Sequence, residues 1–167
     1  MMDKKKLLKI GIVLIAIIVV VVLIVVIVNW NKNAPVRLVE KYISAAEEGD
    51  LDKQEDMFDF DGWYAWEECD EDVDDFYDLY KDVSDNDVEE KINDWGYEDK
   101  EDYIKSIIYG DDNVSYKISG DPDVEKIGKN MYEVEAKIEV DDDGYEFKET
   151  WKFTIYKNKI INMEDVD

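Results

Sequence analysis

Glu149 is the residue whose surroundings in the sequence are best suited to chemistry. Every second residue from Tyr145 to Ile155 is aromatic or aliphatic, except Glu149. In a β-strand alternate residues share a face, so this carboxylate would fall within an apolar row. A carboxylate in such a row loses hydration, as general acids, general bases and ligand-binding groups do. The alternative is a bulge or a widening sheet edge that lets Glu149 reach water.

A ligand pocket around Glu149 would need aromatic walls, and the chain can supply them. We expect the pocket to be lined by Glu149, Tyr145, Phe147, Trp151, Trp66 and Tyr77. Core packing is the alternative role of these aromatic residues. The sequence assigns no catalytic set, because it contains no histidine to act as the base of a Ser-His-Asp or Cys-His arrangement.

Metal and cofactor binding have little support in the sequence. The single cysteine, Cys69, cannot form an internal disulfide or a thiolate cluster. Residues 57–68 match a calcium-binding loop in part, with Asp59, Asp61, Gly62 and Glu68 at suitable positions, but Met57 replaces the first ligand. We predict no metal and no cofactor, and we keep cation binding by the acidic surface as an alternative function.

The elements that would position these residues change from helical to strand periodicity near residue 112. Apolar residues three and four apart predict helices within 34–48, 51–58, 66–83, 85–95 and 103–108, with a break at 60–63. Alternating residues predict strands at 114–118, 132–140, 145–155 and 160–163, with turns at Asp143-Gly144 and Lys157-Asn158. Helices followed by antiparallel strands predict an α+β domain with the helices packed on one sheet face.

An N-terminal apolar segment predicts a membrane anchor. Residues 10–28 are uncharged, and 17 of these 19 are Leu, Ile or Val. As a helix they would be about 28 Å long, close to the hydrocarbon thickness of a bilayer. A cleaved signal peptide is the alternative, but its apolar region is shorter and ends at a small-residue cleavage site. We therefore predict a basic cytoplasmic tail at 1–9, a transmembrane helix at 10–28, a linker at 29–33 and an extracytoplasmic domain at 34–167.

The charge of the chain differs sharply between its two ends. Residues 1–33 contain five lysines and one aspartate, and the positive-inside rule then places the N-terminus in the cytoplasm. Residues 34–167 contain 15 Lys and Arg against 43 Asp and Glu, a net charge of −28. Such a domain repels nucleic acid and attracts cations or basic partners.

The first helix and the closing strands resemble a known superfamily. The run from Ala34 to Asp52, APVRLVEKYISAAEEGDLD, resembles the opening of nuclear transport factor 2-like (SnoaL-like, cystatin-like) domains. The resemblance implies a first helix ending in Gly-Asp, a short second helix, and a curved antiparallel sheet that forms a cone with the helices. It covers roughly residues 34–167, although residues 62–97 are longer and more acidic than the pattern. The superfamily contains both enzymes and binding modules, so the resemblance does not choose between them.

Two functions from different classes follow from these observations. The first, which we favour, is a single-pass, membrane-anchored binding or assembly module whose acidic surface engages a basic protein or peptide. The second is an enzyme of the isomerase or dehydratase kind, acting on a small molecule in a pocket at Glu149. The sheet could also support a homodimer. Lipid contacts are expected through residues 10–28.

Overall fold

The computed structural model of the protein describes residues 19–20, 34–107 and 114–166. The chain divides into two units, Met1–Ala34 and Pro35–Asp167, and the second holds the folded domain. Within the predicted anchor only Val19 and Val20 are described, and both are helical. Among the described residues, no helix has the length and apolar character needed to cross a membrane. The rest of segment 10–28 lies outside the described residues.

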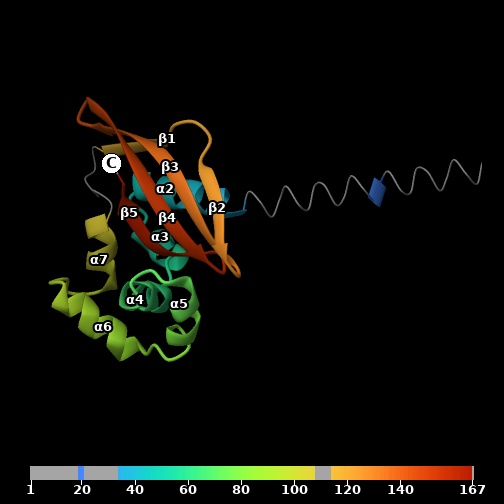
Figure 1. Ribbon diagram of the computed structural model, residues 1–167. Helices are drawn as coiled ribbons and strands as arrows, with labels where there is room; N and C mark the ends of the chain where they lie inside the picture. The colour runs from blue at the N-terminus through green and yellow to red at the C-terminus, as the bar shows by residue number, and fades with distance from the viewer. Residues whose placement is uncertain (1–18, 21–33, 108–113, 167) are drawn as a thin grey trace, which may run out of the picture. The chain divides into compact units, whose positions relative to one another are not determined.

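The α+β architecture predicted from the sequence is confirmed. The described residues form six helices followed by one antiparallel sheet (Figure 1). The helices are α2 (Ala34–Glu47), α3 (Leu51–Met57), α4 (Phe60–Glu68), α5 (Val73–Leu79), α6 (Asp85–Asp94) and α7 (Lys100–Ile107). The strands are β1 (Val114–Ile118), β2 (Asp123–Gly128), β3 (Met131–Asp142), β4 (Tyr145–Tyr156) and β5 (Lys159–Asp165).

The long strands β3 and β4 form the centre of the sheet. The sheet order is β1-β3-β4-β5, and β2 pairs with β3 on the same side as β1. β1 therefore pairs with one end of β3 and β2 with the other. The β3–β4 hairpin turns at Asp143 and Gly144, whose φ angles are 51° and 86°. A two-residue turn with positive φ at both residues has the same twist as the strands that it joins. The turn predicted at Asp143-Gly144 is therefore confirmed.

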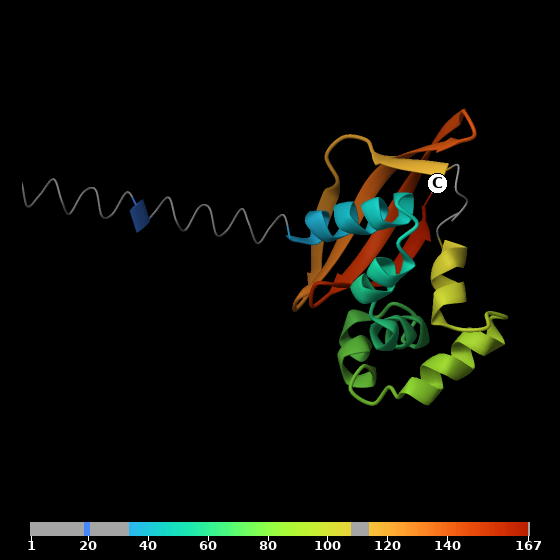
Figure 2. The same ribbon diagram turned by 180° about the vertical axis from the view of Figure 1, so that it is seen from behind.

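Helix α2 covers one face of the sheet, which we call the inner face (Figure 2). Its buried residues recur at helical spacing, and Tyr42 packs edge-on against Phe153 of β4 with ring centroids 6.4 Å apart. β3 contributes buried apolar residues at every second position from Val134 to Val140. This main core fixes the inner face on which the candidate pocket is built.

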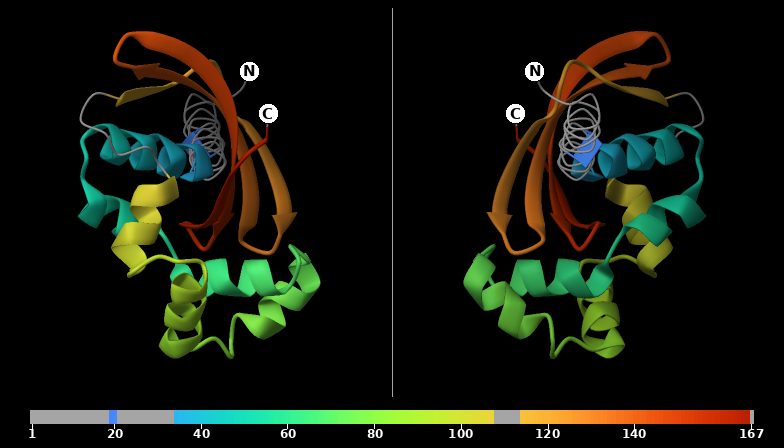
Figure 3. Two further views of the ribbon diagram at one scale, coloured as in Figure 1. Left: turned by 90° about the vertical axis from the view of Figure 1, so that its left-hand side faces the viewer. Right: turned by 90° about the vertical axis from the view of Figure 1, so that its right-hand side faces the viewer.

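Helices α4 and α5 pack at the end of the sheet, next to the β4–β5 turn (Figure 3). They bury a second, smaller cluster that includes Trp66, Phe76, Met131, Tyr156 and Ile161. Close packing of α4 on β5 depends on Gly62. A Cβ atom placed there would lie 2.4 Å from Cγ2 of Ile161, which is much shorter than a van der Waals contact.

Two of the predicted helix boundaries are wrong. The expected break at 60–63 is the first turn of α4, because the Asp59 side chain accepts a hydrogen bond from the Gly62 backbone N–H and caps the helix. The expected helix over 66–83 is instead divided between α4 and α5. Asp70 and Glu71 adopt positive φ angles, and Asp72 caps α5 by accepting from two backbone N–H groups. Apolar spacing alone did not reveal this division, because the stripe continues across the turn.

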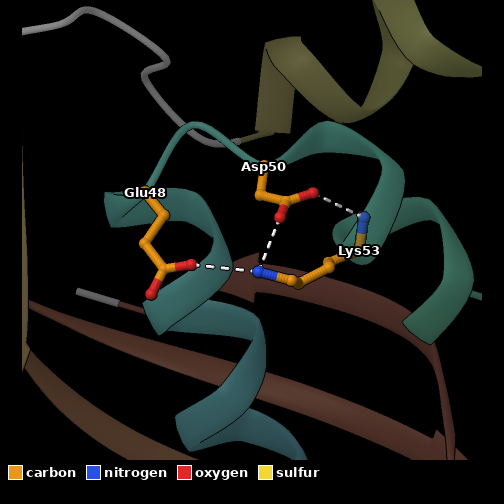
Figure 4. Close-up of polar contacts among 3 residues, drawn as sticks. All are labelled: Glu48, Asp50 and Lys53. Atoms are coloured by element: carbon orange, nitrogen blue, oxygen red, sulfur yellow. Dashed lines mark hydrogen bonds and ion pairs between the residues drawn. The ribbon is translucent and has the colours of Figure 1, made fainter.

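The Gly49-Asp50 pair ends one helix and begins the next, as predicted (Figure 4). Gly49 has a φ of 66°, a conformation in which glycine carries no Cβ penalty. Asp50 then caps α3 by accepting from the Lys53 backbone N–H at 3.1 Å. The Lys53 ammonium also lies 2.6 Å from Asp50 and 3.1 Å from Glu48, so one lysine joins both sides of the turn.

Candidate binding pocket

The predicted site residue Glu149 lies in the wall of a pocket of about 410 Å³ between α7, the α6–α7 connection and strands β4 and β5. The described residues that line it are Trp95, Tyr97, Tyr103, Ser106, Ile107, Glu149, Trp151, Met163, Glu164 and Asp165. The volume is at the lower end of the range usual for ligand sites in proteins. The lining combines aromatic rings with carboxylates, and no Lys or Arg is among these residues.

Strand register determines which carboxylates share the inner face. Glu149 pairs with Ile138 of β3, and Asp165 of β5 pairs with Trp151. Residues opposite each other in an antiparallel pair point to the same side, and so do residues two apart on one strand. Glu149, Trp151 and Asp165 therefore lie on one face. Glu164 pairs with Lys152 on the other face, where the two side chains form an ion pair.

Glu149 is held by a neighbour on its own strand. The indole N–H of Trp151 donates a hydrogen bond of 2.8 Å to Oε2 of Glu149. Trp151 is buried, and its ring packs 5.7 Å from that of Tyr116 on β1. The contact fixes the orientation of the carboxylate and leaves acceptor capacity on it, since an ionised carboxylate can accept about four hydrogen bonds.

The helical side of the pocket is aromatic. The Tyr103 ring of α7 lies 5.4 Å from that of Tyr97 and 6.2 Å from that of Trp95. Burial raises the pKa of Tyr103 well above its ordinary value, with nearby Glu67 adding to the effect. The protonated Tyr103 hydroxyl can serve as a hydrogen-bond donor.

Trp95 contacts both the pocket and the partly buried Lys91. Its side chain is 47% exposed, unusual for a residue of its size. The ammonium of Lys91 lies 5.5 Å from the Trp95 ring centroid and 5.4 Å from that of Tyr64, distances at which a cation is attracted by the π face. The same ammonium forms a 2.6 Å ion pair with Glu68. The protein thus already holds one cation between aromatic rings and a carboxylate.

The structure brings Glu149 and Trp151 into the pocket but places Tyr145 and Phe147 elsewhere. Tyr145 is 73% exposed beside the β3–β4 turn, where the strands extend past the helices. Phe147 is half-buried, and its ring lies 6.0 Å from that of Tyr145. Both share the strand face of Glu149, as predicted, but neither is among the residues that line the pocket.

Trp66 and Tyr77 also lie away from Glu149. Trp66 is buried in the second cluster, 5.9 Å from Phe76 between ring centroids. The Tyr77 hydroxyl donates to the backbone oxygen of Lys129, at the β2–β3 turn. Trp66 belongs to α4 and Tyr77 to α5, and these two helices pack at the end of the sheet next to the β4–β5 turn. Both side chains therefore lie at that end of the sheet. Their role in the described structure is packing, the alternative considered for them.

Sequence reasoning did not select Trp95, Tyr97, Tyr103 or Asp165 for the pocket. Trp95 and Tyr97 flank Gly96, where we expected a helix to end, and such a position is where exposed aromatic residues often have a binding role. Asp165 could have been found from the register of the last hairpin, had the bulge between Thr154 and Ile155 been known.

The partial calcium-loop pattern does not form a loop. Residues 60–68 are helical, and Asp59 is occupied as the cap of α4 and as the acceptor of a 3.0 Å hydrogen bond from the Tyr80 hydroxyl. In the part of the chain that the structure describes, no three Asp, Glu or Cys side chains gather closely enough to hold a metal ion.

No protein-family model matches this chain, and no match was found among curated proteins or solved structures.

Proposed function

We propose that this protein is a membrane-anchored binding module whose acidic domain, outside the cytoplasm, engages a basic protein or peptide. The observation that carries the proposal is the surplus of carboxylates in residues 34–167. Even if each of the 15 Lys and Arg residues were paired, 28 of the 43 carboxylates would have no basic partner. Such an excess creates a negative potential that attracts cationic partners and speeds their association.

The helices at the end of the sheet present many of these carboxylates to solvent. Exposed acidic residues of α5 and α6 are Asp74, Asp75, Asp78, Asp85, Glu89, Glu90 and Asp94. Lysines on this part of the domain are already engaged: Lys81 pairs with Asp78, and Lys91 pairs with Glu68. A basic partner that contacts this surface would relieve repulsion among like charges, and the attraction would weaken as salt screens it.

The N-terminal sequence supports the membrane part of the proposal. Segment 10–28 has the length and apolar character of a bilayer-spanning helix, and the lysines precede it. The domain would then stand on the opposite side of the membrane from the basic tail, after the linker 29–33.

The proposal extends to the kind of fold. The order of α2, Gly49-Asp50, α3 and a terminal antiparallel sheet is that of nuclear transport factor 2-like domains. We propose membership in that superfamily on this order, with α4, α5 and α6 as an additional helical layer. The alternative function, an isomerase or dehydratase acting on a small molecule, would use the same pocket at Glu149.

Two measurements on the full chain test the proposed function. Protease added outside intact cells should cut within residues 34–167, and alkaline carbonate should leave the chain in the membrane fraction. In neutral-lipid nanodiscs the chain should bind a polylysine probe, with affinity falling at least tenfold between 50 and 300 mM salt, as expected for several screened charge contacts. A chain that carbonate releases contradicts the anchor, and binding that is absent or insensitive to salt contradicts the basic partner.

A further inference from the structure

We infer that a groove beside α3, which we call the α3 groove, binds an extended segment of the basic partner. It consists of two adjoining cavities of about 440 Å³ each, and Glu55 and Lys100 line both of them. The first lies between α3, the end of α6 and the start of α7, and the second between α3 and the starts of α4, α7 and β5. The inference rests on the proposed function and makes it specific, because it assigns the basic partner to one groove of the domain.

The α3 groove is more negative than other cavities of the domain. Two lysines line it together with seven acidic residues, which are Asp52, Glu55, Asp56, Glu89, Glu98, Asp99 and Glu101. By contrast, the cavity lined by Lys117 and Lys148 has three carboxylates against these two lysines. The cavity between α2 and α3 has two acidic and two basic residues. Charge complementarity therefore favours the α3 groove as the place where a basic segment binds.

Four carboxylates of the groove are available to a partner. They are exposed, and among the described residues they have neither a hydrogen bond nor an ion pair; they belong to Asp52, Glu55, Glu89 and Glu98. Two others are engaged within the protein. Asp99 accepts a hydrogen bond of 2.8 Å from the backbone N–H of Asp102, and Glu101 forms a 2.6 Å ion pair with Lys105.

Buried apolar residues also line the groove. Ile92 lines the first cavity, Phe58 and Phe60 line the second, and each of the three is at most 6% exposed. Lysine and arginine pack their methylene stems on such surfaces while their charged ends stay beside carboxylates or water. In an extended segment, alternate side chains point to one side and lie about 7 Å apart. Two basic residues separated by one residue can therefore enter the two adjoining cavities.

Two ammonium groups of the protein itself already lie in the groove. That of Lys100 lies 5.2 Å from the ring centroid of Phe60, a distance at which a cation is attracted by the π face. That of Lys159 donates a hydrogen bond to the backbone oxygen of Asp56. The groove thus offers a ring face and a backbone acceptor to cations, in addition to its carboxylates. Because Lys100 lines both cavities, its charge would oppose a bound basic segment.

Peptide binding to the full chain in an uncharged detergent tests the inference. The probe is a short Gly-Ser peptide with lysine at three alternate positions, and a second peptide carries uncharged acetyl-lysine at the same positions. Titration calorimetry measures the affinity, and the Ile92 methyl and Asn93 side-chain amide resonances report the location. We expect the lysine peptide to bind at low salt and to shift both resonances, and the acetylated peptide to do neither.

The decisive variant is Glu55→Gln with Glu89→Gln, which removes two exposed charges from the groove and keeps the side-chain shapes. The matched control is Glu125→Gln with Glu135→Gln, which removes the same charge from exposed positions on β2 and β3. The groove variant should bind the lysine peptide about tenfold more weakly, whereas the control should lose less than about twofold.

A second pair of variants tests the groove in the opposite direction. Lys100→Met keeps the packing on Phe60 and should bind the lysine peptide about threefold more tightly. Lys126→Met, at an exposed position on β2, should change the affinity by less than about 1.5-fold. A gain of affinity cannot come from loss of folding, so this pair decides the matter if the Glu55 and Glu89 variant melts earlier than the parent.

Equal losses in the groove variant and its control would overturn the groove inference and leave the proposed function standing, since binding would then follow net charge alone. Equal effects of Lys100→Met and Lys126→Met would overturn it in the same way. Ile92 and Asn93 resonances that shift with protein concentration, without peptide, would show that a second copy of the chain occupies the groove, and the inference would fail. If the lysine peptide does not bind the parent even at low salt, the proposed function fails as well.

Discussion

The ammonium of Lys91 lies 2.6 Å from Oε1 of Glu68, and this ion pair joins α6 to α4 across the helical layer. The lysine is largely buried while the glutamate side chain is 45% exposed. The two partners therefore differ in what their removal leaves behind. Loss of Glu68 leaves a desolvated cation, whereas loss of Lys91 leaves a carboxylate that water can reach.

Glu68→Gln should accordingly destabilise the fold more than Lys91→Met. We expect a cost of about 1–2 kcal/mol for the first and less than about 1 kcal/mol for the second, because methionine retains the apolar contacts with the surrounding rings. Chemical denaturation of both variants and of the double variant measures this. A double variant less stable than Glu68→Gln alone would contradict the explanation.

Asp59 is expected to be the most sensitive acidic residue in the helical layer. Its carboxylate caps α4 through Gly62 and accepts from the Tyr80 hydroxyl, so it joins the α4 terminus to the end of α5. Asp59→Ala should cost about 2–3 kcal/mol, the sum of a lost cap and a lost charge-assisted hydrogen bond. Tyr80→Phe should cost about 1 kcal/mol, and Asp61→Ala, two residues later in the first turn of the same helix, serves as control. A similar loss in Asp59→Ala and Asp61→Ala would show that the cap is unimportant.

Gly62→Ala should destabilise the protein although alanine favours helices. The added methyl gains about 1 kcal/mol in helix propensity but overlaps Cγ2 of Ile161, and overpacking costs about 1–3 kcal/mol. The overlap disappears when Ile161 is shortened to alanine. We therefore expect Gly62→Ala to lower stability in the parent and to lower it much less in an Ile161→Ala background, where only the 3.2 Å contacts of the new methyl with Asp59 remain, as measured by thermal melting of the four proteins. An equal loss in both backgrounds would rule out the steric explanation.

Glu67→Gln should stabilise the protein at neutral pH. Burial raises the pKa of Glu67, Lys91 opposes this, and neighbouring acidic residues such as Glu71 add to it. Because the folded state holds this proton more tightly than the unfolded chain, ionisation of Glu67 opposes folding, and stability falls as pH rises through the raised pKa. Glu67 is partly exposed, so solvent reduces the effect, and we expect the melting temperature at pH 7 to rise by about 1–3 °C.

The advantage of Glu67→Gln should shrink as the pH is lowered towards 4, where the parent also becomes neutral at this position. Glu90→Gln removes the same charge from an exposed position on α6 and provides the control. A constant difference between the Glu67 variant and the parent across this pH range would indicate general relief of charge repulsion and not burial of one carboxylate.

The strands were predicted better than the helices, for a physical reason. In β3 and β4 apolar and polar residues alternate because successive side chains point to opposite faces of the sheet. This alternation correctly placed Glu149 on the inner face, between Phe147 and Trp151. In α4 and α5 the apolar residues keep their helical spacing across the turn between the two helices, because both helices bury one side in the same cluster. The spacing therefore does not show where one helix ends and the next begins. The short strand β2 was missed, since its burial pattern has little alternation and its register with β3 shifts between Glu125 and Gly128.

The pocket was predicted only in part. Glu149 and Trp151 lie two apart on one strand, so their proximity follows from local sequence. Trp95 and Tyr103 reach the same pocket through tertiary packing of α6 and α7, which no local pattern encodes. Aromatic residues alone were a poor guide, because Trp66 and Tyr77 belong to a core that forms only when the helical layer folds over the end of the sheet.

The interrupted edges of the sheet bear on how copies of the domain behave at high concentration. The edge of β3 is covered by two short strands, β1 and β2, that are separated by residues 119–122. On the other side, β5 is kinked by a register shift, and Phe58 forms a parallel bridge to Ile160. Among the described strands, neither side offers a long straight row of free N–H and C=O groups. Neighbouring copies of the domain would thus be kept from joining sheet to sheet into fibrils.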